Sequence, residues 1–257
     1  MGHIRLPSLP KTKRWREVVA LLGSPAGSAA AVASATLDAI DKRFVENGLD
    51  AGLVRIVWLL AKLPDAARSG AFESELAMLG IDAPNSSTVA GLTAELAKAI
   101  DDHLDAQHRR TDTAEMALGA AIESLTRDLV GRTTSLFPDA SDVPRALAAV
   151  GTEAQFGKLV SGFFARFTGH CLRSFVDREL PRHVGDGQRF RTVAEQAEFA
   201  RALELHCQQA SKIVETFAGK WWAKARHEQD LTEARTGRFV GYALQKMRDE
   251  LRRGAQG

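Results

Sequence analysis

The most constraining feature of this sequence is a long apolar stripe near the C-terminal end. Its members recur every three or four residues, which is the spacing of one face of an α-helix. Thr192 followed by Glu195 is a capping box, which is typical of a helix start. The pattern therefore predicts one unusually long helix. Its expected inward side chains are Phe199, Leu203, His206, Ala210, Ile213, Phe217 and Trp221.

Shorter stretches of the same periodicity fill most of the remaining chain, and caps, prolines and glycines separate them. No stretch alternates as a strand would. We therefore expect an all-α fold, a multi-helix bundle or array of about nine or ten helices with three long helices at the C-terminal end. The expected helices span 13–22, 24–46, 50–63, 69–80, 88–108, 112–131, 141–150, 152–180, 192 onward and 232 onward.

The domain organisation follows from the breaks between these segments. Pro7 and Pro10 exclude a helix at the start, so residues 1–12 are expected to form an extended arm. Residues 13–257 are long enough for a single helical domain with a substantial core. Residues 81–87 read as a linker, and they divide the domain into the sub-domain candidates 13–80 and 88–257.

Charge and cysteine content narrow the class of protein. The net charge is only +2, but residues 1–20 carry five basic side chains against one acid, and residues 181–257 carry 14 against 10. Two basic ends therefore flank an acidic middle. The two cysteines are too few for a disulfide framework, and no apolar run reaches the ~20 residues of a membrane span. These features predict a cytoplasmic protein without a membrane partner.

The motifs that carry common chemistry fail on spacing. Gly151 to Lys158 has one residue too many between its glycines for a phosphate loop, and no strand precedes it. The pairs His170-Cys171 and His206-Cys207 each place neighbouring side chains about 100° apart on a helix, which is poor geometry for one metal ion. No nucleophile motif is present. We therefore expect no cofactor, no bound metal and no catalytic residue.

Two groups of residues suggest a protein interface. Ile4, Leu6 and Leu9 alternate along the arm, so one side of it is apolar and suited to packing on a partner or on a second copy of the chain. Trp15 lies beside the arm. Trp222 is turned about 100° away from the apolar stripe, so it either covers a second packing face or lies exposed at an interface.

Arginine-rich regions suggest a different partner. Arginine near aromatic residues suits contacts with phosphates and stacking on bases. The simpler interpretation is that these arginines decorate solvated helix ends, and the small net charge favours it. The nucleic-acid candidates are Lys11, Lys13, Arg14, Arg16, Arg182, Arg189 and Arg191.

Taken together, these patterns favour a non-enzymatic helical scaffold or adaptor subunit of a bacterial multi-protein assembly. A nucleic-acid-associated module using the arginine-rich regions is the first alternative. An enzyme with an unfamiliar all-helical active site near His170, His183 and His206 is the second.

Overall fold

The computed structural model describes residues 13–46, 49–107, 111–133 and 141–256, without the side chains of 40–46 and 256. Ten α-helices and two short 3-10 helices make up most of this part of the chain, and it contains no strand, which confirms the all-α prediction. The helices are α1 (Lys13–Gly23), α2 (Ala29–Glu46), α3 (Ala51–Ala66), α4 (Phe72–Met78), η1 (Pro84–Ser86), α5 (Val89–Ala106), α6 (Asp112–Val130), α7 (Asp142–Val150), α8 (Glu153–Val176), η2 (Leu180–His183), α9 (Val193–His227) and α10 (Glu233–Gln256).

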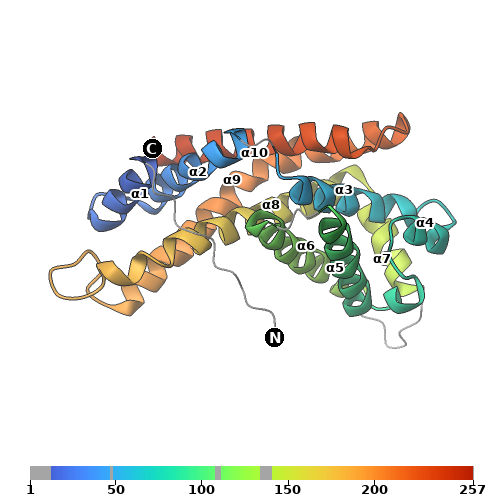
Figure 1. The fold of residues 1–257 in the computed structure, drawn as a ribbon, viewed down its shortest axis with the longest axis horizontal. Coiled ribbons are helices and arrows are strands. Elements are labelled where there is room, and N and C mark those ends of the chain that lie inside the picture. The colour runs from blue at the N-terminus through green and yellow to red at the C-terminus, as the bar shows by residue number, and fades with distance from the viewer. Residues whose placement is uncertain (1–12, 47–48, 108–110, 134–140, 257) are drawn as a thin grey trace.

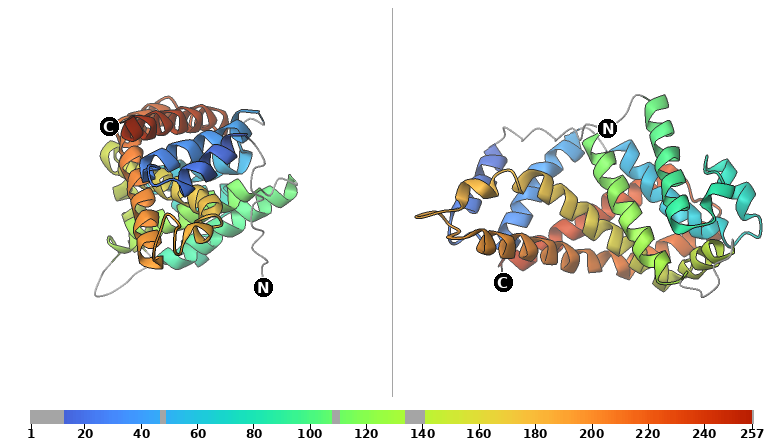
Figure 2. Two further views of the ribbon diagram at one scale, coloured as in Figure 1. Left: turned by 90° about the vertical axis from the view of Figure 1, so that its left-hand side faces the viewer. Right: turned by 90° about the horizontal axis from the view of Figure 1, so that it is seen from below.

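An antiparallel pair, α8 and α9, runs the length of the elongated molecule (Figure 1). Helix α10 lies along one side of this pair. Helices α1 and α2 cover one end, and α3 to α7 gather at the other, as the two views in Figure 2 also show. The long C-terminal helices therefore form the scaffold on which the N-terminal helices pack.

Local capping signals fix several helix starts. The hydroxyl of Thr192 accepts a hydrogen bond from the Glu195 amide at 3.2 Å, as the capping box predicts. Three other predicted starts are wrong. Helix α4 begins at Phe72 and not at 69, because the Ser69 hydroxyl accepts from the Ala71 amide before the helix starts. Helix α2 begins after Ser28, whose hydroxyl accepts from the Ala31 amide, because Ser24 instead forms a turn that closes at Gly27. The cap of α6 is Thr111, one residue before the predicted Asp112.

The hydrophobic core is one contiguous cluster that extends from Trp15 to Leu251. It includes residues on both sides of 81–87, because α2 packs on α9 and α10, and α3 packs on α6 and α10. The predicted sub-domain boundary is therefore not marked by a break in the core.

Helix α9 is buried on two faces, not on the single predicted stripe. Towards α8 it buries a set of mostly small side chains, including Cys207, Val214 and Ala218. Towards α10, the Trp221 ring stacks on Phe239 with 4.1 Å between centroids. A helix with neighbours on two sides has a wider apolar surface than a one-faced amphipathic helix.

Trp222 belongs to the core between these faces. Its ring stacks on Phe156 at 5.1 Å, and its indole N–H donates to the Ala61 carbonyl oxygen at 2.9 Å. The alternative in which Trp222 covers a second packing face is thus confirmed, and exposure at an interface is wrong. The tryptophan ties α9 to α8 and α3 because its one polar atom finds a buried acceptor.

Candidate interaction groove over helix α8

A groove of about 360 Å³ runs over α8, with α6 forming one wall and α9 the other. Its floor is low because Ser161, Gly162 and Ala165 carry small side chains or none. Three basic residues of α8, namely Lys158, Arg166 and Arg173, share this outward face, within about 100° of arc. We define the α8 groove by these floor residues and the charged residues of its two walls, Glu123, Arg127 and Asp128 of α6 and Glu204, Lys212 and Glu215 of α9.

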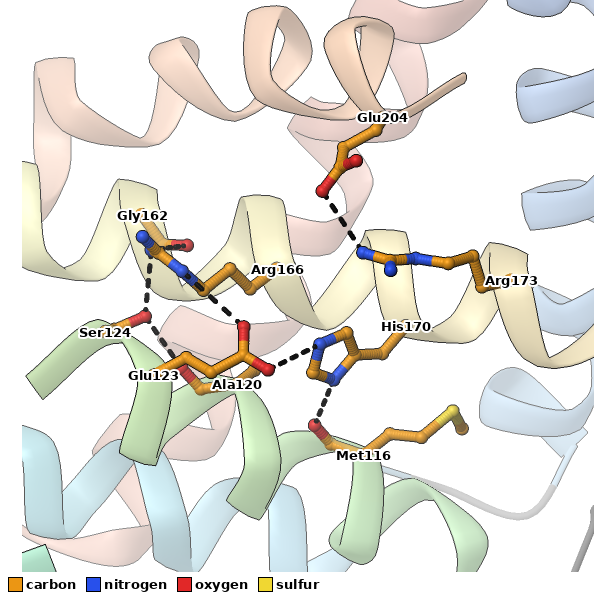
Figure 3. A network of polar contacts seen from close by, with 9 residues as sticks. All are labelled: Met116, Ala120, Glu123, Ser124, Gly162, Arg166, His170, Arg173 and Glu204. Atoms are coloured by element: carbon orange, nitrogen blue, oxygen red, sulfur yellow. Dashed lines mark hydrogen bonds and ion pairs between the residues drawn. The ribbon is translucent and has the colours of Figure 1, made fainter. Parts of the chain in front are cut away.

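One half of the groove holds a connected polar network (Figure 3). The Glu123 carboxylate lies 3.8 Å from the Arg166 guanidinium and 3.2 Å from Nε2 of His170. The Nδ1 atom of His170 lies 3.3 Å from the Met116 carbonyl oxygen. Both ring nitrogens thus face oxygen atoms, and the contact to Glu123 is an ion pair when the imidazole is protonated. The network links α6 to α8.

The Arg166 side chain lies across the floor because Gly162 leaves room for it. Its Nη1 atom donates to the Gly162 carbonyl oxygen at 2.9 Å and to the Ser124 hydroxyl at 3.1 Å. A Cβ atom at position 162 would stand only 3.0 Å from the same nitrogen. Burial lowers the pKa of Arg166, and the positive charge of Arg127 lowers it further, so the two guanidinium groups repel each other.

A salt bridge between the α8 floor and the α9 wall lies at the end of this half of the groove. Arg173 of α8 pairs with Glu204 of α9 at 3.1 Å. Its two side chains are about half exposed, so the pair contributes little to stability, typically under about 1 kcal/mol. Its effect is to fix the position of two charges at one end.

The other half of the groove contains charges that the protein does not pair. Arg127, Lys158 and Lys212 have no carboxylate within ion-pair distance among the described residues. Asp128 lies among them, and burial raises its pKa, while Arg132, Arg166 and Arg127 act in the opposite direction. The groove as a whole carries five cations and four carboxylates, and three of its cations, Arg127, Lys158 and Lys212, make no ion pair in the described part of the chain.

A second groove, of about 840 Å³, lies between α3 and the turn from α9 to α10, but its charges are paired internally. Arg55 binds Glu233 at 2.6 Å, and Arg226 binds Asp65 at 2.7 Å. The Trp58 indole N–H donates to the Leu231 carbonyl oxygen at 2.8 Å. These contacts hold the turn against α3, so the larger groove is explained by the fold itself.

Among the predicted interface residues, the structure describes the two tryptophans, and both are buried. Ile4, Leu6, Leu9 and Lys11 lie outside the described residues. Trp15 does not lie at the surface. Its ring is buried against Phe175 at 5.9 Å between centroids, because α1 packs it into the core. Of the predicted partner-binding residues, the two tryptophans are therefore corrected to core residues.

The predicted nucleic-acid residues divide into internal and exposed ones. Arg189 is an internal tie: its guanidinium donates to the carbonyl oxygens of Leu21, Leu22 and Gly27 at the end of α1, and it lies 4.3 Å over the Phe199 ring. These three hydrogen bonds occupy the guanidinium donors that a phosphate would need, so the prediction of nucleic-acid binding is wrong for Arg189. The side chains of Arg182, Arg191, Lys13, Arg14 and Arg16 are exposed.

Burial disfavours the reactive thiolate form of both cysteines. Both are buried, and burial raises the pKa of the Cys207 thiol to about 12 and that of Cys171 further still. Among the described residues, no group of three His, Cys, Asp or Glu side chains is placed to hold a metal ion. No helix in this part of the chain has the length and apolar character required to cross a membrane.

Sequence reasoning missed the α8 groove. Its floor does leave a signal, since Lys158, Arg166 and Arg173 recur about every two turns along an otherwise aromatic helix. Its walls come from segments some 40 and 50 residues away, as the contacts from Arg166 to Ser124 and from Ser161 to Ser211 show. Comparisons with protein-family models, with curated protein sequences and with solved structures each return no match.

Proposed function

We propose that this protein is a non-enzymatic interaction subunit of a multi-protein assembly and that its α8 groove holds an acidic segment of a partner protein. The observation that supports this most directly is that three cations around a concave floor, Arg127, Lys158 and Lys212, make no ion pair among the described residues. A partner carboxylate would add to the attraction that Glu123, Asp128 and Glu204 already exert on Arg166 and would offset its repulsion from Arg127.

The shape of the site fits a peptide segment. The floor of small residues leaves room for side chains, and the two helical walls would hold a segment parallel to α8. The acidic residues of the groove act as a filter, because Asp128 and Glu215 would repel a partner whose carboxylates are out of register. Electrostatic complementarity of this kind mainly provides specificity and a faster association rate.

Charge reversal in the groove tests the proposal. Tagged protein from its native host would be compared with the double variant Lys158→Glu and Lys212→Glu, and the partners that copurify would be identified and quantified. The matched control carries the same charge change at two exposed positions outside the groove, Lys98→Glu and Arg238→Glu.

An identified partner would then be titrated directly against all three proteins. We expect the groove variant to bind at least about tenfold more weakly, about 1.4 kcal/mol, because each reversal removes an attraction and adds a repulsion. The control should bind as the unmodified protein does. A partner that binds all three proteins with the same affinity would exclude the α8 groove as its site.

A further inference from the structure

Helix α1 and the end of α10, which belong to the two basic regions of the sequence, lie close together in space. Helix α1 and the end of α10 both pack on α2 (Figure 1, Figure 2). They converge on one residue of α2, Asp38. The Arg14 guanidinium donates to its backbone carbonyl oxygen at 2.9 Å, and Arg252 binds its carboxylate at 2.7 Å. Segments more than 200 residues apart in sequence thus form one surface.

This surface is rich in exposed arginine. We define the terminal basic surface by five exposed side chains, Lys13, Arg14, Arg16, Arg252 and Arg253. The charges of the two α10 members are matched, Arg252 by Asp38 and Arg253 by Glu250 at 2.6 Å. The three members on α1 have no carboxylate partner in the described part of the chain, and their exposed acidic neighbour on the same helix is Glu17.

We propose that the terminal basic surface binds the phosphodiester backbone of a nucleic acid. It lies outside both grooves, so it presents its charges outward on two helices, which suits contact with a backbone from outside. Four of its five cations are arginines, whose planar guanidinium matches the geometry of phosphate oxygens. The contacts at Asp38 place the unpaired cations of α1 beside Arg252 and Arg253, whose charges are already matched, so the main phosphate contacts are expected from α1.

An anionic membrane is the less suitable partner. Membrane-surface helices combine basic residues with large apolar side chains that enter the lipid. The large apolar side chains that are exposed in the described residues are Met78, Val130, Val193, Leu205 and Tyr242, and none lies on α1 or near the end of α10 beside Arg252. In the part of the chain that the structure describes, this surface can contact phosphates but carries no large apolar side chain to insert into lipid.

The terminal basic surface keeps the sequence candidates Lys13, Arg14 and Arg16 and omits those of the loop between α8 and α9. Arg189 is used internally, and Arg182 is matched by Glu179 at 3.0 Å. Arg182 and Arg191 lie in the loop between α8 and α9, which packs on the far end of α1 from Lys13, so they serve as a control that carries the same change of charge away from the terminal basic surface. Phosphate contacts from α1 instead make binding steeply dependent on salt, with a slope of about 0.9 per contact in a plot of log affinity against log salt for duplex DNA.

The experiment measures fluorescence anisotropy of a labelled DNA duplex of about two helical turns and of a single-stranded RNA, between about 50 and 200 mM salt. The unmodified protein is expected to bind at least one of them at low salt. Lys13→Gln with Arg16→Gln should make the slope on duplex shallower by about 2, or somewhat less on a single strand. Arg182→Gln with Arg191→Gln should leave it unchanged.

Other outcomes would overturn the proposal. No binding of either nucleic acid at the lowest salt would do so, as would equal slopes for the Lys13 and Arg16 variant and the unmodified protein. Binding to phosphatidylserine vesicles in place of nucleic acid would assign the surface to a membrane instead. The α8 groove variant, Lys158→Glu with Lys212→Glu, should retain nucleic-acid binding. The test of the terminal basic surface is therefore independent of the test of the α8 groove. Circular dichroism melting confirms that each exposed variant still folds.

Discussion

Replacing Gly219 with alanine probes how closely α8 and α9 pack. Gly219 lies in the middle of α9, where alanine would ordinarily stabilise a helix by about 1 kcal/mol relative to glycine. In this structure a Cβ at position 219 would collide with the backbone carbonyl oxygen of Glu153 at the start of α8. Because the obstacle is backbone and not a flexible side chain, the two helices would have to move apart.

The sign of the effect depends on which of these contributions is larger. Overpacking a close helix contact costs about 1–3 kcal/mol, and the separation would also loosen the stacking of Phe156 on Trp222 three residues along α9. Because the obstacle is backbone, the cost lies in the upper part of that range, about 2–3 kcal/mol, and subtracting the gain of about 1 kcal/mol in helix propensity leaves a net loss of about 1–2 kcal/mol. For a protein of this size, that loss lowers the melting temperature by roughly 2–8 °C.

Gly169 in α8 provides the matched control. It is also in a helix interior, yet a Cβ there would meet no atom within 4 Å. We therefore expect Gly169→Ala to stabilise the protein by up to about 1 kcal/mol. Urea unfolding followed by circular dichroism measures both variants. A denaturation midpoint for Gly219→Ala at or above that of the unmodified protein would refute the packing argument.

Further predictions concern single features of the structure. Arg189→Met keeps the aliphatic stem but removes the donors to three carbonyl oxygens, and it should destabilise the protein by about 2–3 kcal/mol in urea unfolding. Burial raises the pKa of Asp128, so the folded state favours the protonated carboxyl, and the stability that Asp128 contributes at low pH is lost as the pH rises through its folded pKa. Asp128→Asn should therefore flatten the pH dependence of stability in the acidic range. It should leave the protein as stable or more stable at pH 7. Cys207, with its pKa raised to about 12, and Cys171 should react with a thiol reagent at neutral pH only after unfolding, as mass spectrometry of native and denatured samples would show. Deleting residues 1–12 should reduce the mass of the native assembly measured by light scattering, and an unchanged mass with unchanged partner binding would exclude the arm as a contact.

Helix starts were predictable where a single capping residue was available and ambiguous where several competed. Thr192 stands alone before the long helix, so its cap could be located from sequence. Between Leu22 and Val32 both Ser24 and Ser28 are capping residues, and each hydroxyl accepts an amide hydrogen bond. The two bonds are equally local, and only the packing of α2 decides which serine begins the helix.

The candidate site was harder to predict because its chemistry depends on what lies opposite each side chain. Arg189 and Arg191 are two residues apart and look alike in sequence. Arg189 donates hydrogen bonds within the protein because carbonyl oxygens at the end of α1, such as that of Leu22 at a separation of 167 residues, lie within reach of its guanidinium. Arg191 is exposed. On α8, Lys158 and Arg173 differ in the same way, since a glutamate of α9 meets only the second. An arginine or lysine is therefore a candidate for binding only where the tertiary fold leaves its charge unmatched, and that condition points to Lys158, Lys212 and Arg127 in the groove and to Lys13, Arg14 and Arg16 on α1.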